Sequence, residues 1–485
     1  MDPRTPCLVG VGQRTYRRTP APEPLEQWAE AAAEAAKDSG APGLLGALDS
    51  LQVVYCESWS YDDPAGRLAA LLGADPRQRR YSGIGGNVPQ RLVGDAAAAI
   101  ARGEMDVALV VGGEALATRR AARKAGERTA WSFPATPRPP YPLEVYPLAT
   151  ELAHGVHPAW LTFALLETAR RAASGESPQE ERRSRGAIMS AMSAVAEANP
   201  YAWFRQRRAA DELVTPTPGN RLVGSPYTKH TVAVIDVDMS AAVLLTSTAA
   251  ADAAGVPADR RVYLRGQGYA EDAWHIAARA DLDRSAAMRA ASAAALTTAG
   301  LGLDDIGVLD LYACFGSAVR FACDALGLDP GDPRGLTVTG GLPFAGGPGS
   351  AYLLHALATL TGRLREEGGH GLLSGVGMHM TKHIYGVWSA EPGFAAGVDL
   401  GAVGEPREVV DRHEGDAVVA ACSVVHGRDG VAERGIAVVE LPDGARAYGW
   451  IEDPALLAEA GREEPVGRTV RLTAKGEQNI IDWEE

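Results

Sequence analysis

Cysteine is scarce in this sequence, and no two cysteines are closely spaced. The five cysteines among 485 residues lie far apart, at positions 7, 56, 314, 323 and 422. They form neither a Cys-x-x-Cys pair nor a disulfide framework, which predicts a protein of the reducing cytoplasm. The N-terminus lacks a basic segment followed by an apolar one, so we expect no signal peptide. The odd cysteine count leaves open that one thiol takes part in chemistry.

Long apolar runs and an excess of positive charge are also missing. No stretch approaches the roughly 18 uncharged apolar residues that a membrane-spanning helix needs. Acidic residues outnumber basic ones by 61 to 47, and the net charge of −14 disfavours binding to nucleic-acid phosphates. We therefore expect neither a membrane nor a nucleic acid as partner. The hydrophobic fraction of 46% is sufficient for large cores, and the length predicts about three structural units.

The hydrophobic pattern predicts a duplicated α/β core. Residues 8–12 and 51–55 have the pattern of buried strands, and a helical pattern lies between them. This alternation is typical of parallel strands covered by helices. The same order returns later, because Tyr312 lies 257 residues after Tyr55 and Gly268 lies 256 residues after Gly12. Two nearly equal offsets indicate that a βαβ half-domain occurs twice.

Two further parts interrupt or follow this core. Residues 118 to about 230 contain basic clusters, a proline-rich stretch and long polar helices, which predict an inserted helical domain. After residue 400, six short strand patterns separated by turns predict a small closed antiparallel β-barrel. We therefore divide the chain into residues 1–250, which include the insertion, residues 251–400, and the barrel at residues 401–485.

Four segments together resemble the thiolase superfamily. They are residues 103–114, 238–245, 340–348 and 374–377, and they occur in the order expected for that superfamily. The subfamily resembles the sterol-carrier-protein type of thiolase. Residues 310–315 and 377–389 are most similar to the thiolase-like proteins type 1, which also carry an extra C-terminal β-domain. The resemblance implies a five-layered fold in which a β-α-β-α-β-α-β-β unit occurs twice.

The catalytic groups that the resemblance implies are absent from their positions. Thiolases use a cysteine at a helix N-terminus, an activating histidine and a second cysteine. Gly86 stands at the position of the first cysteine, and Ser374 stands at that of the second. The histidine belongs in a Gly-His-Pro motif, which reads Gly346-Gly347-Pro348 here. Glycine cannot form a thioester, and a serine hydroxyl is a far weaker acid than a thiol. Ordinary thiolysis or Claisen condensation through an acyl-cysteine is therefore not expected.

Other titratable residues near these motifs are candidates for replacement chemistry. Cys314 is either a substitute nucleophile or a small core residue, and Tyr312 is a candidate proton donor. His383 is a candidate general acid–base, with Lys382 or Tyr385 stabilising an enolate or oxyanion. The alternative is that these are structural groups. His379 lies four residues before His383, but no third ligand is near, so we predict no metal.

Basic and aromatic residues in the insertion suggest where a cofactor would bind. In thiolases the equivalent loop domain holds coenzyme A, whose phosphates favour arginine and whose adenine stacks on flat groups. The candidate contacts are Arg119, Arg120, Arg123, Trp203 and Arg205. The alternative is a solvated basic face. The predicted small-molecule partner is an acyl thioester of coenzyme A, bound as a substrate and not as a permanent cofactor.

Three functions remain open from the sequence. The first is acyl transfer to an external nucleophile, with His383 as base and Cys314 as acyl carrier. The second is formation or cleavage of a carbon–carbon bond by tyrosine and histidine acid–base groups, as in thiolase-like aldolases. The third is a non-catalytic acyl-CoA-binding scaffold. Ordinary thiolases are dimers, and we expect this chain to be a monomer or a homodimer.

Overall fold

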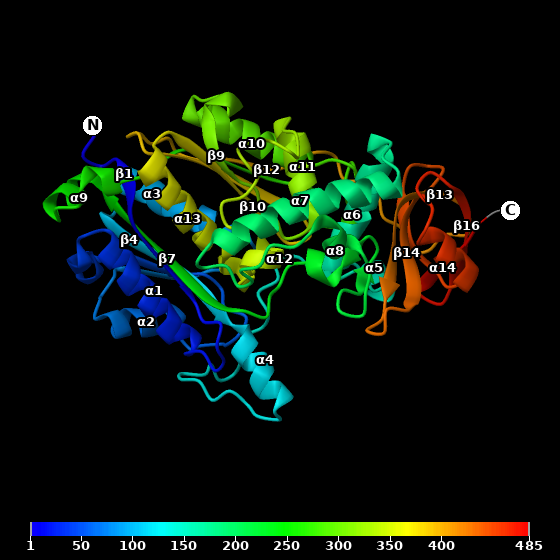
Figure 1. Ribbon diagram of the computed structural model, residues 1–485, viewed down its shortest axis with the longest axis horizontal. Coiled ribbons are helices and arrows are strands. Elements are labelled where there is room, and N and C mark those ends of the chain that lie inside the picture. The colour runs from blue at the N-terminus through cyan, green and yellow to red at the C-terminus, as the bar shows by residue number, and fades with distance from the viewer. Residues whose placement is uncertain (1, 484–485) are drawn as a thin grey trace.

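Two five-stranded sheets form the centre of the protein. The computed structural model describes residues 2–483 (Figure 1). The first sheet has the order β1 (Pro6–Thr15), β7 (Asp238–Ser247), β4 (Val107–Ala115), β2 (Ser50–Val53), β3 (Gln78–Tyr81). The second has the order β12 (Val398–Ala402), β8 (Tyr263–Glu271), β11 (Lys382–Ser389), β10 (His370–Gly377), β9 (Ile306–Asp310). Because β8-β11-β10-β9 repeats the arrangement β1-β7-β4-β2, the predicted duplication is confirmed.

Helices complete a five-layered core. α1 (Pro24–Asp38) and α2 (Pro64–Leu72) cover the outer face of the first sheet, and α10 (Ala286–Ala299) packs on the second, with α11 (Gly316–Leu326) beside it. Between the sheets lie α3 (Val88–Ala101) and α13 (Tyr352–Glu367), each of which contacts strands of both sheets. The α/β thiolase fold expected from the sequence is therefore present.

The repeated Gly-x-Gly pairs have the same packing role in both halves. A Cβ atom at Gly12 would lie 2.1 Å from the carbonyl oxygen of Ala31 on α1. A Cβ atom at Gly268 would lie 2.1 Å from the carbonyl oxygen of Ala291 on α10. Only glycine allows the helix backbone to approach the strand this closely. The glycine pairs are therefore the sequence trace of one helix–strand contact that occurs twice.

The insertion is largely helical; α5 to α8 lie between the core and the C-terminal domain, and α4 lies below the core (Figure 1). Its elements are α4 (Leu116–Lys124), α5 (Ala149–Ala153), α6 (Ala159–Ser174), α7 (Pro178–Ala198), α8 (Ala210–Val214), β5 (Leu222–Gly224) and β6 (Tyr227–Thr228). α7 begins with a capping box, in which the Ser177 hydroxyl accepts from the Glu180 N–H and the Glu180 carboxylate accepts from the Ser177 N–H. Two short core helices are α9 (Thr248–Ala253) and α12 (Leu342–Ala345).

The C-terminal domain is a closed five-stranded barrel with its own core. Its strands are β13 (Gly415–His426), β14 (Ala432–Glu440), β15 (Arg446–Ile451), β16 (Thr469–Lys475) and β17 (Gln478–Trp483), and α14 (Pro454–Ala460) covers one side. The order β14-β15-β17-β16-β13 closes through a β13–β14 pairing. All pairs are antiparallel except β15–β17, which is parallel.

The barrel differs in detail from the six predicted strands. Two of the predicted strands, residues 417–419 and 424–425, belong to the single strand β13. A third, residues 409–410, is only an isolated bridge between Val409 and Arg446. β17 was not predicted because its polar residues weaken the alternation. β13 also pairs with β5, so the barrel sheet continues into the insertion. Within residues 2–483 no helix is both long and apolar enough to cross a membrane.

Candidate active site

The N-terminus of the central helix α3 lies where the resemblance places a nucleophile. Gly86 lies two residues before α3 begins. A Cβ atom at Gly86 would lie 2.2 Å from the Tyr312 hydroxyl oxygen and 2.4 Å from the Val376 carbonyl oxygen. Both distances are far below van der Waals contact. The phenol of Tyr312 therefore occupies the space that a cysteine side chain at position 86 would need.

The neighbouring motif residues are buried and committed to packing. The Ser374 hydroxyl accepts a hydrogen bond of 2.9 Å from the Tyr312 N–H, and the Tyr312 ring packs edge-on against Tyr352 at 5.3 Å. Cys314 is 7% exposed. Burial raises the pKa values of the Cys314 thiol and of the Tyr312 phenol, so both stay protonated at neutral pH. A protonated, buried thiol is a poor nucleophile.

His383 belongs to a buried polar cluster at the start of β11. Its Nε2 lies 3.2 Å from an Asp272 carboxylate oxygen and 3.0 Å from the Met380 carbonyl oxygen. The Asp272 carboxylate also accepts from Arg279 at 2.8 Å and from Ser285. Burial alone would raise the pKa of Asp272, but Arg279 and His383 lower it well below the usual value. This network holds the β10–β11 hairpin in place.

The two other candidates on β11 have different surroundings. Lys382 places its ammonium 4.2 Å from the centre of the Trp274 ring and pairs with the Glu144 carboxylate. Tyr385 is 1% exposed, and burial raises its pKa. The segment from His379 to His383 is a turn followed by a strand, so the two histidines do not share a helix face.

A cavity of about 360 Å³ lies beside these motifs. It is bounded by Ile84, by the loop at residues 141–147, by α5 and α6, by the loop after β8, and by the β10–β11 turn. Apolar side chains form much of its wall. Its polar and aromatic lining consists of Tyr141, Tyr146, Glu151, His157, Thr162, Trp274, His275 and His379. Tyr312, Cys314 and Ser374 are not among the lining residues.

A carboxylate–imidazole pair opens into this cavity. The Nδ1 atom of His275 lies 2.9 Å from a Glu151 carboxylate oxygen, and the other oxygen accepts from the Tyr448 hydroxyl at 3.0 Å. Burial would raise the pKa of Glu151, but hydrogen bonds from His275, the Leu148 N–H and Tyr448 lower it, so the carboxylate is ionised. A carboxylate at Nδ1 fixes the imidazole with its Nε2 lone pair available to a ligand.

His379 presents a second imidazole to the same cavity. The Thr162 hydroxyl donates to the Ala159 carbonyl and therefore accepts from His379 Nδ1, at 3.0 Å. Burial lowers the pKa of His379, so the ring is neutral at pH 7. Its neighbours Met378 and Met380 have φ angles of 55° and 58°, a left-handed conformation that non-glycine residues rarely adopt. Such strain is typical of residues at functional sites.

Sequence reasoning did not find Glu151 or His275. The two residues are 124 positions apart and follow no motif. Only the packing of α5 against the loop after β8 brings them together. The density of titratable groups at residues 379–385 was a usable signal, but only His379 of this segment lines the cavity, and the signal did not identify the pair.

The predicted coenzyme A contacts lie in more than one place. Arg119 lines a neighbouring cavity of about 280 Å³ with Arg138 and Trp59. Tyr141, which lines the first cavity, makes an edge contact of 5.9 Å with Tyr55. The other candidates are dispersed. Arg120 pairs with Asp236, and Arg123 is exposed. Trp203 packs against Gly346, and Arg205 donates to the Glu197 carbonyl. Arg138 was not predicted.

The described part of the chain also shows how its metal-ligating residue types are distributed. Among residues 2–483, no group of three or more His, Cys, Asp or Glu side chains is arranged to hold a metal ion.

Comparison with known proteins identifies the family. No protein-family model and no curated protein matches the chain. A crystal structure of a monomeric SCP2-thiolase-like protein type 1 from Mycobacterium smegmatis is 31% identical, with all of both chains covered and a TM-score of 0.85. The fold is shared with an Ltp2–ChsH2(DUF35) aldolase (16% identity, TM-score 0.61, 80% of this chain and 98% of that chain). It is also shared with the dimeric peroxisomal thiolase of Saccharomyces cerevisiae (12% identity, TM-score 0.59, 81% and 98%). The chain belongs to the SCP2-thiolase-like protein type 1 family of the thiolase superfamily.

Proposed function

We propose that the protein binds an acyl thioester of coenzyme A and catalyses proton transfer on its acyl group, without forming an acyl-enzyme. The observation that carries the proposal is the Glu151–His275 pair beside the cavity of about 360 Å³. An ionised carboxylate at Nδ1 orients the imidazole and stabilises the imidazolium that forms when Nε2 accepts a proton. The apolar remainder of the wall suits the acyl chain.

The reaction class that fits best is cleavage or formation of a carbon–carbon bond. His275 Nε2 would remove the hydroxyl proton of a β-hydroxyacyl thioester. The bond between the α- and β-carbons then breaks, which yields a carbonyl product and the thioester enolate, and His275 returns the proton to the α-carbon. Tyr141 lines the same cavity and is about half exposed; its phenol is protonated at neutral pH and is a suitable donor to the enolate oxygen.

Acyl transfer through Cys314 receives less support. The thiol is buried and protonated, and the position of the usual nucleophile is filled by Tyr312. His383, the base expected for that route, hydrogen-bonds to Asp272 and to a backbone carbonyl within the protein. A non-catalytic acyl-CoA-binding scaffold remains the second candidate. A binding protein needs no nucleophile, so the Tyr312 phenol in the space beside Gly86 is compatible with that role as well.

Ligand orientation follows from the two neighbouring cavities. Arg119 and Arg138 line the smaller one, and guanidinium groups bind phosphate oxygens through paired hydrogen bonds. We propose that the phosphates of coenzyme A lie there, next to the Trp59 ring, while the acyl group lies against His275. The monomeric state stated for the M. smegmatis structure is proposed for this chain as well.

The test is exchange of the α-protons of acyl-CoA in D₂O. A base next to the acyl group of acetyl-CoA or butyryl-CoA introduces deuterium at the α-carbon, which mass spectrometry detects. His275→Gln should lower the exchange rate by about 10²- to 10⁴-fold. Cys314→Ala is the matched control and should exchange like the wild type.

Three outcomes separate the alternatives. Exchange that is unchanged in His275→Gln contradicts the assignment of the base. A covalent acyl adduct in the intact mass that disappears in Cys314→Ala would restore the acyl-transfer route. Binding of acyl-CoA without exchange in the wild type would favour the scaffold.

A further inference from the structure

A cavity of about 450 Å³ lies between the insertion and the barrel, away from the candidate active site. Its walls come from α6, α7, β13 and the segment that follows α14. α6 lines both cavities, with Thr162 at the active-site cavity and Thr168 and Arg171 at this one. Thr162 and Thr168 are six residues apart, about 9 Å along the helix, and the two cavities share no lining residue.

Four arginines and two glutamates line this cavity of about 450 Å³. Two of the arginines are deeply buried: the Arg171 and Arg185 side chains are only 7% and 2% exposed. A buried guanidinium is costly unless it is paired. An anion can therefore be bound only if some arginines at the cavity have no carboxylate partner.

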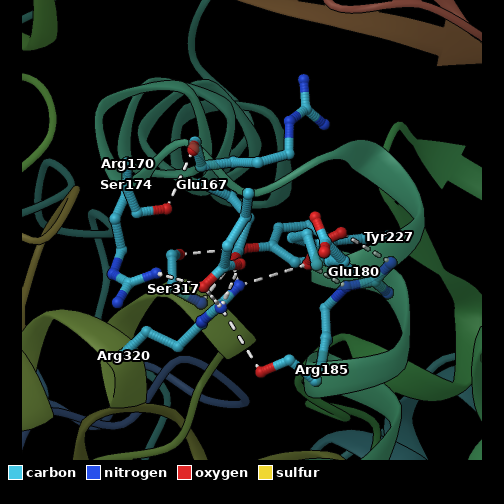
Figure 2. Close-up of polar contacts among 12 residues, drawn as sticks. Glu167, Arg170, Ser174, Glu180, Arg185, Tyr227, Ser317 and Arg320 are labelled. Atoms are coloured by element: carbon cyan, nitrogen blue, oxygen red, sulfur yellow. Dashed lines mark hydrogen bonds and ion pairs between the residues drawn. The ribbon is translucent and has the colours of Figure 1, made fainter.

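Arg185 belongs to a buried cluster of charged residues from α6, α7 and α11 (Figure 2). Arg185 donates to Glu181 at 2.7 Å, and Arg320 pairs with Glu167 at 3.3 Å and lies 3.7 Å from Glu181. The Tyr227 hydroxyl donates to Glu167 at 2.7 Å. Burial raises the pKa of Glu167, while Arg320 and Arg185 lower it in part. Glu181 is thus already engaged by two arginines and does not neutralise the other cations at the cavity.

The remaining carboxylates near the cavity are also engaged. Glu464 accepts from Arg171 at 2.7 Å, and Glu463 accepts from Arg468 at 2.8 Å. Arg182 donates to the Thr215 hydroxyl, and Arg462 donates to the Ala458 carbonyl. Within residues 2–483 neither Arg182 nor Arg462 has a carboxylate partner. One uncompensated cation from α7 and one from the barrel therefore line the same cavity.

We propose that this cavity binds the phosphate group of a small phosphorylated molecule and so joins the insertion to the barrel. Guanidinium groups form paired hydrogen bonds to phosphate oxygens, and this cavity is lined by one such group from α7, Arg182, and one from the segment after α14, Arg462. Arg171 also lines the cavity, but its charge is balanced by Glu464, so the proposal rests on Arg182 and Arg462. The cavity is larger than one phosphate needs, and Val214, Leu222 and Pro465 provide apolar wall for an attached organic group.

The proposal is tested by calorimetric titration of the full chain with inorganic phosphate, pyrophosphate and AMP. Binding with a Kd of about 1 mM or tighter is expected for at least one probe, weakening as salt is added. The double variant Arg182→Gln/Arg462→Gln should bind at least about tenfold more weakly, because both uncompensated charges are removed. Both side chains are exposed, so the variant should fold. Arg183→Gln is the matched control, since Arg183 follows Arg182 on α7 and does not line the cavity.

Hydrogen exchange then locates the ligand. Protection is expected at the start of α7 and at residues 460–465. Tighter binding of AMP than of inorganic phosphate shows that the apolar wall contributes, and equal affinity shows that the anion alone is recognised. No binding of any probe, equal weakening in Arg183→Gln, or protection confined to other segments overturns the proposal. The same probes also suit the proposed thioester site at Arg119 and Arg138, so the titrations are repeated in Arg119→Gln, where the weakening caused by Arg182→Gln/Arg462→Gln should persist.

Discussion

Replacing Gly86 with alanine adds a methyl group where Tyr312 already lies. The new Cβ atom would lie 2.2 Å from the phenolic oxygen and 2.4 Å from the Val376 carbonyl oxygen, where ordinary contacts begin at 3.4 Å. The tyrosine can shift, but the carbonyl belongs to β10, which pairs with a strand on each side and cannot turn away. Overpacking of this kind costs about 1–3 kcal/mol and occasionally more, so we expect a loss of about 3 kcal/mol in unfolding free energy.

The assay is guanidinium unfolding of the full chain, followed by tryptophan fluorescence. Gly362→Ala is the control, because Gly362 lies within α13 with no atom within 4 Å of an added Cβ, and alanine there should be neutral or stabilising by about 1 kcal/mol. Gly86→Ala/Tyr312→Phe should recover only part of the loss, since the Val376 contact remains. An alanine at position 86 that changes stability by less than about 0.5 kcal/mol would refute the argument that Tyr312 closes the nucleophile position.

Two further predictions concern buried charge. Burial raises the pKa of Asp310 to about 6, above the unfolded value of about 3.9, so the contribution of Asp310 to stability falls as pH rises from about 4 to above 6. The neutral variant Asp310→Asn lacks this loss and should gain up to about 3 kcal/mol relative to the wild type between pH 4 and pH 7.5 in denaturant titrations; a constant difference would contradict the prediction. Arg320→Leu should lower the unfolding free energy by about 3–5 kcal/mol, because it leaves Glu167 and Glu181 buried with one fewer cation. Thermal unfolding measures this, with the exposed Arg289→Leu as control, and an equal shift in both variants would show that the cluster is not essential to stability.

The fold was largely predictable because its signals are local and repeated. The Gly-x-Gly pairs at Gly12 and Gly268 reflect a backbone contact that any helix–strand packing of this type needs, so the duplication is visible in the sequence. The barrel strands were found from alternation and turns, except β17, whose polar residues conceal the pattern.

The candidate site was only partly predictable, since its main pair depends on tertiary contacts. Motif positions predicted that Gly86 and Ser374 replace reactive groups, and the structure supplies the reason for Gly86 in the phenol of Tyr312. The Glu151–His275 pair joins the insertion to the C-terminal half, and no spacing along the chain encodes that contact. Cys314 and His383 are buried and do not line the cavity, and the sequence does not show this either.

The pairing of β5 with β13 has a consequence for the order in which the chain folds during synthesis. Val425 of β13 pairs with Gly224 of β5, so one sheet joins segments separated by about 200 residues. The insertion leaves the ribosome long before its partner strand exists, and domains made first normally fold first. Here the middle of the chain cannot complete its last sheet until the barrel has been made. A chain truncated before residue 415 would leave the edge of β5 unpaired, which makes the C-terminal domain a requirement for finishing the insertion.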